Sequence, residues 1–202
     1  MDDAGRLLAR ISPTISWRGF SSGFAAETIS PDVLDRLPPD YLALLKTLGG
    51  GEGFLGDSFL RLYSLDESAA ANREYHVTEF LPGCYLFGSD GCGNAYLFDL
   101  QKPEILFVSF IPLDRRLARS MGSDFSGFLE SLSRLPPGSR SPMPANANPD
   151  LDGKEIHEIH PVVLGGDPVN LANKVFITPP QHAKASTFFN RLVREMRAQQ
   201  ET

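Results

Sequence analysis

The stretch Cys84-Tyr85-Leu86-Phe87-Gly88-Ser89-Asp90-Gly91-Cys92-Gly93-Asn94-Ala95-Tyr96-Leu97-Phe98-Asp99 decides the fold. Two apolar, aromatic-rich runs, 84–87 and 95–99, flank a glycine-rich polar segment. Asp90-Gly91 supplies the residue types that tight hairpin turns prefer. The stretch therefore predicts an antiparallel hairpin. Its glycines do not have the spacing of a phosphate-binding loop, and a strand rather than a helix is expected to follow them.

The segments on either side of this hairpin predict further strands and a helix. Residues 104–110 are rich in Ile, Val and Phe, and residues 59–63 alternate, so both are expected to be strands. Residues 39–48 predict a helix whose buried face repeats every three or four positions, and Gly49 is expected to end it. The segment 68–79 is compatible with a short helix or an irregular excursion.

A second amphipathic helix is predicted after residue 123. Ser123 is its expected N-cap, and Pro136-Pro137-Gly138 is expected to end it. Its buried stripe consists of Phe125, Phe128, Leu129, Leu132 and Leu135.

Composition narrows the possible functions. The 202 residues are 42% hydrophobic and 22% charged, which is typical of a chain that folds around a core. The net charge of −6 argues against a nucleic-acid binder and fits a basic protein partner. The two cysteines provide neither a disulfide framework nor a metal-binding pattern. With no secretory signal and no membrane-length apolar run, the expected location is the cytoplasm.

The order of these motifs resembles the SUKH superfamily, which includes yeast cell-wall assembly regulators and bacterial immunity proteins. The resemblance covers roughly residues 31 to 135. It implies an α+β fold whose antiparallel sheet is flanked by helices, and a role in neutralising a toxin, frequently a nuclease, by direct binding without a cofactor. The matching residues are Leu37-Pro38-Pro39-Asp40-Tyr41, Gly49-Gly50, Phe87-Gly88-Ser89-Asp90-Gly91, Gly93-Asn94, Tyr96-Leu97-Phe98-Asp99-Leu100 and Phe125-Ser126-Gly127-Phe128-Leu129.

Acidic and turn residues between the predicted strands are the candidates for contact with a basic toxin. Solvated loop charge is the alternative explanation for each acidic residue, and Asp90 and Asn94 are also ordinary turn formers. The candidate partner-binding residues are Asp57, Asp66, Glu67, Glu74, Glu79, Asp90 and Asn94.

The chain divides into residues 1–135, a Pro-, Gly- and Asn-rich linker at 136–153, and a C-terminal extension at 154–202. The extension predicts strands at 154–159 and 174–177, then a long helix that starts at Thr178-Pro179. An extension this small is expected to dock on the first domain or on a partner. The predicted apolar stripe of its helix is Ala185, Phe188, Phe189, Leu192, Val193 and Met196.

The extension also resembles a degenerate HNH-type ββα finger. The resemblance implies that His157 or His160 would activate water, that Asn173 would orient that histidine, and that His182 would hold a divalent metal. Two departures argue against activity. The neighbours Ile156 and Ile159 stand where a second metal ligand is expected, and the extension has no CxxC pair.

Three functions remain open. The first is a non-enzymatic immunity protein that occludes a toxin and needs neither metal nor cofactor. The second is a metal-dependent nuclease that uses His157, His160, Asn173 and His182. The third is a regulatory scaffold, which differs from the first only in its partner.

Overall fold

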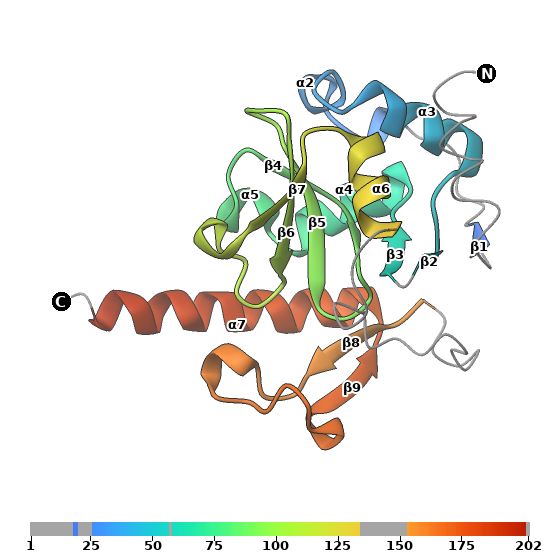
Figure 1. Ribbon diagram of the computed structural model, residues 1–202. Helices are drawn as coiled ribbons and strands as arrows, with labels where there is room; N and C mark the ends of the chain where they lie inside the picture. The colour runs from blue at the N-terminus through green and yellow to red at the C-terminus, as the bar shows by residue number, and fades with distance from the viewer. Residues whose placement is uncertain (1–17, 20–25, 57, 134–152, 201–202) are drawn as a thin grey trace.

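A single antiparallel meander organises the molecule (Figure 1). The computed structural model describes residues 18–19, 26–56, 58–133 and 153–200. Within these ranges seven strands pair in sequence order, each antiparallel to the next. The strands are β1 (Arg18–Gly19), β2 (Gly51–Leu55), β3 (Ser58–Leu62), β4 (Cys84–Ser89), β5 (Asn94–Asp99), β6 (Glu104–Ser109) and β7 (Arg119–Gly122).

The helices begin and end largely where the local sequence predicts. Helix α3 (Pro39–Leu48) has the predicted bounds, and Gly49 ends it in the left-handed conformation with φ 73°. The uncertain segment 68–79 falls within two helices, α4 (Leu65–Glu74) and α5 (Val77–Phe80). The other described elements before residue 134 are α2 (Pro31–Leu34), α6 (Phe125–Ser133), and the 3₁₀ turns η1 (Ala26–Thr28) and η2 (Arg115–Leu117).

The central strands are buried on both faces, which explains their nearly continuous apolar sequences. Side chains alternate along a strand, so Tyr85 and Phe87 point to one face while Cys84 and Leu86 point to the other. Helices α3 and α6 cover the first face, α5 and the C-terminal helix cover the second, and α4 contributes buried residues to both. This arrangement confirms the predicted antiparallel sheet flanked by helices.

One predicted helix start is wrong by a residue. Asp124, not Ser123, precedes the first residue of α6, and its Oδ1 accepts a hydrogen bond from the Gly127 N–H at 2.7 Å. Both residue types cap helices well. Composition alone therefore does not distinguish two adjacent capping residues.

The C-terminal extension has the predicted order of strand, strand and long helix. It comprises β8 (Glu155–Glu158), η4 (Val162–Leu164), η5 (Leu171–Asn173), β9 (Lys174–Ile177) and α7 (Pro179–Gln200). Strands β8 and β9 form a separate two-stranded antiparallel sheet. Figure 1 shows α7 lying between this hairpin and the main sheet. The domain boundaries at 135 and 153 remain predictions, because most of the linker lies outside the described residues.

The predicted inward stripe of α7 is wrong. Phe188 is 63% exposed and Met196 is 44% exposed, whereas Val193 is buried. The buried face is mostly polar because it meets backbone groups that need hydrogen-bond partners. Thr187 Oγ1 donates to the Glu74 carbonyl at 3.2 Å. The buried residues of α7 are His182, Ala183, Ser186, Thr187, Asn190 and Val193.

Asn190 makes the most direct of these links. Its amide nitrogen donates to the Phe110 carbonyl at 2.9 Å, and its Oδ1 accepts from the Leu113 N–H at 2.8 Å. One side chain therefore satisfies both a donor and an acceptor in the loop after β6.

Glu155 joins β8 to the main sheet through a buried polar contact. Its side chain is fully buried, and Ser89 Oγ donates to its Oε1 at 3.0 Å. Burial raises the pKa of Glu155 to about 7, although the nearby charge of Arg61 opposes the shift. The backbone of β8 is linked as well, because the Ile156 N–H donates to the Gly91 carbonyl at 3.1 Å.

We expect Glu155→Gln to flatten the pH dependence of stability. A folded-state pKa above the unfolded value means that Glu155 favours folding most below about pH 4.5, and that this contribution is lost as the pH rises through 7. Relative to Glu155→Gln, the unsubstituted protein should lose roughly 2–3 kcal/mol of unfolding free energy between pH 4.5 and 8. Urea titrations at several pH values measure this difference. Glu195→Gln, an exposed change on α7, is the control, and parallel curves for the two variants would contradict the expectation.

In the parts of the chain that the structure describes, none of the helices combines the length and apolar character that a membrane crossing requires.

Candidate protein-binding site

The described acidic residues predicted to contact a toxin lie on α4, on α5 and in the turn between β4 and β5. Asp66 and Glu67 lie in the first turn of α4, and Glu74 lies at its last residue. Glu67 completes the capping box with Ser64. Glu79 on α5 is bound by Arg191 of α7 at 3.1 Å, and this contact together with other nearby cations lowers its pKa. Asp57 lies outside the described residues.

Asp90 and Asn94 build the hairpin turn. Asp90 is buried, and its Oδ1 accepts hydrogen bonds from the backbone N–H groups of Cys92 and Asn94 at 2.8 and 2.9 Å. The Asn94 amide donates to the other carboxylate oxygen at 2.7 Å. Burial nevertheless raises the pKa of Asp90. These contacts give both residues a structural task, and Asp90 is not presented to a partner.

A different acidic surface is present at the opposite end of the sheet from Asp90. It is a groove of about 580 Å³ between α2, α3, the β5–β6 turn and the start of α6. We name it the acidic groove. Its lining contains three more carboxylates than cationic groups. The charged lining residues are Asp35, Arg36, Asp40, Asp99, Lys102, Glu104 and Asp124.

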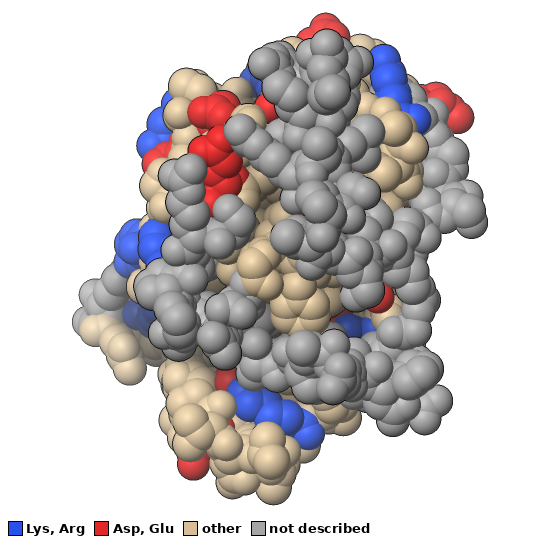
Figure 2. Space-filling view, turned by 45° about the vertical axis from the view of Figure 1, so that its right-hand side comes forward, with Lys and Arg blue, Asp and Glu red and all other residues tan. Residues whose placement is uncertain are grey.

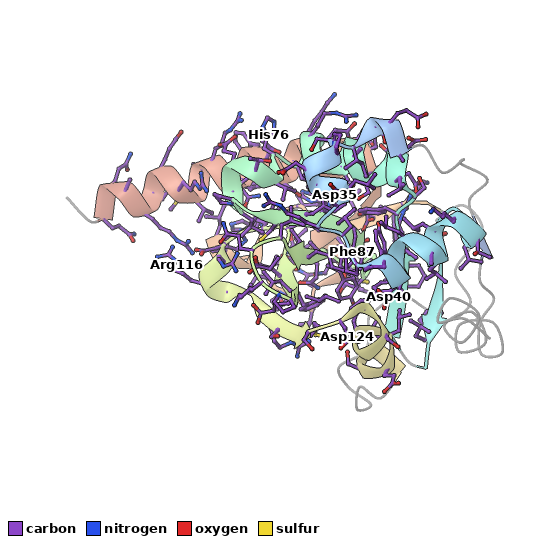
Figure 3. All side chains as sticks on the ribbon, turned by 90° about the horizontal axis from the view of Figure 1, so that it is seen from above. Asp35, Asp40, His76, Phe87, Arg116 and Asp124 are labelled. Carbon is purple, nitrogen blue, oxygen red and sulfur yellow. The ribbon has the colours of Figure 1, made fainter. Side chains whose placement is uncertain are left out.

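Pairing leaves three of these carboxylates as the main source of negative charge. Asp99 is paired with Arg115, and Glu104 with Lys102. The remaining acids are Asp35, Asp40 and Asp124. Burial raises the pKa of Asp40, and the negative charge of Asp124 adds to the shift. Figure 3 shows Asp40 on α3 near Asp124, which directly precedes α6, with Asp35 farther along.

The groove combines this charge with apolar walls. Leu37, Leu100 and Ile105 line it together with Pro38, Pro39 and Pro103. A lysine or arginine side chain has the matching character, because its aliphatic stem packs on apolar surface while its cationic head reaches carboxylates. In the space-filling view, Asp and Glu side chains gather on the upper part of the face shown (Figure 2).

The histidines and asparagine of the predicted nuclease set separate into two pairs. His157 on β8 and His182 on α7 are both buried, with ring centroids 5.3 Å apart. His160 is exposed, and Asn173 holds its backbone: Asn173 Oδ1 accepts from the His160 N–H at 2.8 Å, and Nδ2 donates to its carbonyl at 2.9 Å. A Cβ on Gly166 would lie 1.8 Å from that carbonyl, so this loop closes tightly around His160.

The surroundings of His157 and His182 are those of side chains packed in a protein interior. The Tyr75 hydroxyl and His182 Nδ1 form a hydrogen bond of 2.7 Å. Burial lowers the pKa of both imidazoles, to about 3 for His182, so both are neutral near pH 7. No group of three or more His, Cys, Asp or Glu side chains within the described ranges is arranged to hold a metal ion. The set therefore does not fit the metal centre that the finger resemblance implies.

One family model matches the middle of the chain. The model of the SMI1/KNR4 family (SUKH-1) matches residues 34–131. This part of the chain is thus similar to the SUKH-1 family, which confirms the resemblance seen in its motifs. The match contains most of the main sheet and ends before the C-terminal extension. The likeness of the extension to an HNH finger remains unconfirmed. None of the curated proteins matches this chain.

Proposed function

We propose that the protein is an immunity-type binder that neutralises a bacterial toxin in the cytosol by covering its functional surface. The similarity to the SUKH-1 family supports a protein partner. The acidic groove, with Asp40 and Asp124 beside apolar walls, is the observation that carries the proposal. Occlusion needs shape and charge complementarity and requires no catalytic group, metal or cofactor.

The acidic groove suits a basic toxin better than the acidic residues that the sequence analysis selected. Nucleases that act on phosphates carry cationic clefts, and a lysine or arginine from such a cleft would reach the carboxylates of the groove. Glu79 and Asp90 are engaged within the protein, as described above. The proposed contact residues are therefore Asp35, Asp40 and Asp124.

We expect the double variant Asp40→Asn, Asp124→Asn to weaken toxin binding roughly 10- to 100-fold in Kd. Asparagine keeps the oxygen that accepts from the Tyr41 N–H and remains a good N-cap at 124, so the fold should persist. Calorimetry with the toxin encoded beside the gene measures Kd, and co-expression measures protection of cells. Glu195→Gln on α7 is the matched control for loss of negative charge. An unchanged Kd in the double variant would exclude the groove, and failure of the unsubstituted protein to bind or protect would overturn the proposed function.

The nuclease alternative retains one supporting observation, the clamp of Asn173 on the backbone of His160. Incubation with plasmid DNA and Mg²⁺ or Mn²⁺ distinguishes the two functions. Nicking that is abolished by His160→Ala would favour the nuclease.

A further inference from the structure

Strand β9 has one edge that no other described strand pairs with. The Ile159 N–H donates to the Asn173 carbonyl at 2.9 Å, in register with the β8–β9 ladder. Hydrogen-bonded pairs alternate in an antiparallel ladder, so His157–Val175 is also such a pair. The backbone N–H and C=O groups of Lys174 and Phe176 consequently point away from β8. Among the strands that the structure describes, β8 is the only partner of β9.

The outward backbone groups of β8 and β9 differ in their hydrogen bonding. On β8 the outward Ile156 N–H is satisfied by the Gly91 carbonyl of the main domain. On β9 the corresponding outward groups have no backbone hydrogen-bond partner among the described residues. Exposed strand edges are templates for pairing unless charge, proline or a covering segment protects them. The charge of Lys174 is neutralised by Glu158, with Nζ 2.6 Å from Oε1, so it gives little protection.

Exposed apolar side chains are concentrated in the part of the chain that contains β9. With the exception of Leu117, every exposed large apolar side chain in the described residues lies between residues 159 and 196. Val169 and Leu171, in the loop that leads into β9, are 82% and 85% exposed. Figure 1 shows this loop and β9 projecting on the side of α7 away from the main sheet. A concentration of exposed apolar side chains favours an interaction with another protein.

We propose that β9 pairs antiparallel with β9 of a second copy of this chain, forming a continuous four-stranded sheet about a two-fold axis. In this register Val175 lies on the axis, opposite Val175 of the second copy. Lys174 of each copy then lies opposite Phe176 of the other, and the outward backbone groups of each such pair exchange hydrogen bonds. Registers that place Lys174 opposite itself are disfavoured, because like charges directly opposite repel.

The chemistry of the surface favours a second copy over a basic toxin. A two-fold interface must be complementary to itself, and an apolar edge whose one cation is already neutralised meets that requirement. The acidic groove, by contrast, is suited to a cationic partner and lies on other elements. A stable dimer buries about 800 Å² on each partner, more than four strand residues provide, and the exposed apolar loop between β8 and β9 supplies additional surface.

Charge reversal on the axis tests the proposal. Val175 is 36% exposed and can carry a charged side chain without deep burial. Sedimentation velocity over a roughly hundredfold concentration range should show a dimer for the unsubstituted protein. Val175→Glu alone and Val175→Lys alone should each weaken dimerisation at least roughly 10-fold, because like charges meet across the axis. An equimolar mixture of the two variants should restore the dimer.

Leu117→Glu introduces the same charge at an exposed apolar position on η2 and should leave the dimer intact. Far-ultraviolet circular dichroism checks that each variant is folded. A protein that stays monomeric at every concentration overturns the proposal. A dimer that persists in both Val175 variants also overturns it, because the interface would then lie elsewhere. Both results leave the toxin-binding proposal intact.

Discussion

Replacing Phe87 by alanine should lower the free energy of unfolding by about 3–5 kcal/mol. Phe87 is fully buried at the centre of the main core, where its ring stacks on Phe98 at a centroid distance of 4.1 Å. It also meets Tyr41, Phe125 and Phe128 edge-on. Truncation removes these contacts and leaves a cavity between the sheet and helices α3 and α6. The loss is a large share of the 5–15 kcal/mol that stabilises a typical domain.

Urea denaturation measures this loss directly. Phe188→Ala makes the same chemical change at a side chain that is 63% exposed, and should alter stability by no more than about 0.5 kcal/mol. A cost below about 1 kcal/mol for Phe87→Ala would show that the aromatic cluster is not the main anchor of the sheet.

Asn190→Ala is the second change from which we expect a large effect. Asn190 is 2% exposed and serves the Phe110 carbonyl and the Leu113 N–H together. Truncation leaves both backbone groups buried without a partner, at a cost of roughly 2–4 kcal/mol. Because the contact ties α7 to the main domain, amide hydrogens along α7 should also exchange faster.

Two further variants sharpen the test. Asn190→Asp keeps an oxygen that accepts from the Leu113 N–H. At low pH the protonated carboxyl still has an O–H to donate to the Phe110 carbonyl, so the cost should be smaller than that of alanine. When the carboxyl ionises it loses that donor and buries a charge, so the cost should rise with pH. Glu195→Ala changes an exposed residue of the same helix and should have little effect. Exchange rates in α7 that match those of the unsubstituted protein would contradict the assigned role of Asn190.

Local patterns predicted the parts of the fold that depend on local chemistry. The hairpin at 84–99 follows from an Asp-Gly turn between apolar runs, and α3 follows from its apolar period and Gly49. The inward face of α7 could not be predicted in this way. Its polar residues are explained by backbone acceptors and donors far away in sequence, such as the Phe110 carbonyl that Asn190 reaches across 80 positions.

The acidic groove was missed for a related reason. Asp35 and Asp40 are near each other in the sequence but far from Asp124, and only the fold brings the two segments together. The sequence analysis favoured Glu79 and other acidic residues because they lie between the predicted strands. Folding instead places Glu79 against Arg191, where its charge is already used.

The buried polar face of α7 determines when a newly made chain can finish folding. Ribosomes deliver the N-terminal residues first, so every strand of the main sheet emerges before the residues that close one of its faces. Until His182 and Asn190 leave the exit tunnel, the hydroxyl of Tyr75 and the loop at 110–113 lack the partners that they have in the finished protein. Deleting the last helix would reproduce that unfinished nascent state and expose the same surface.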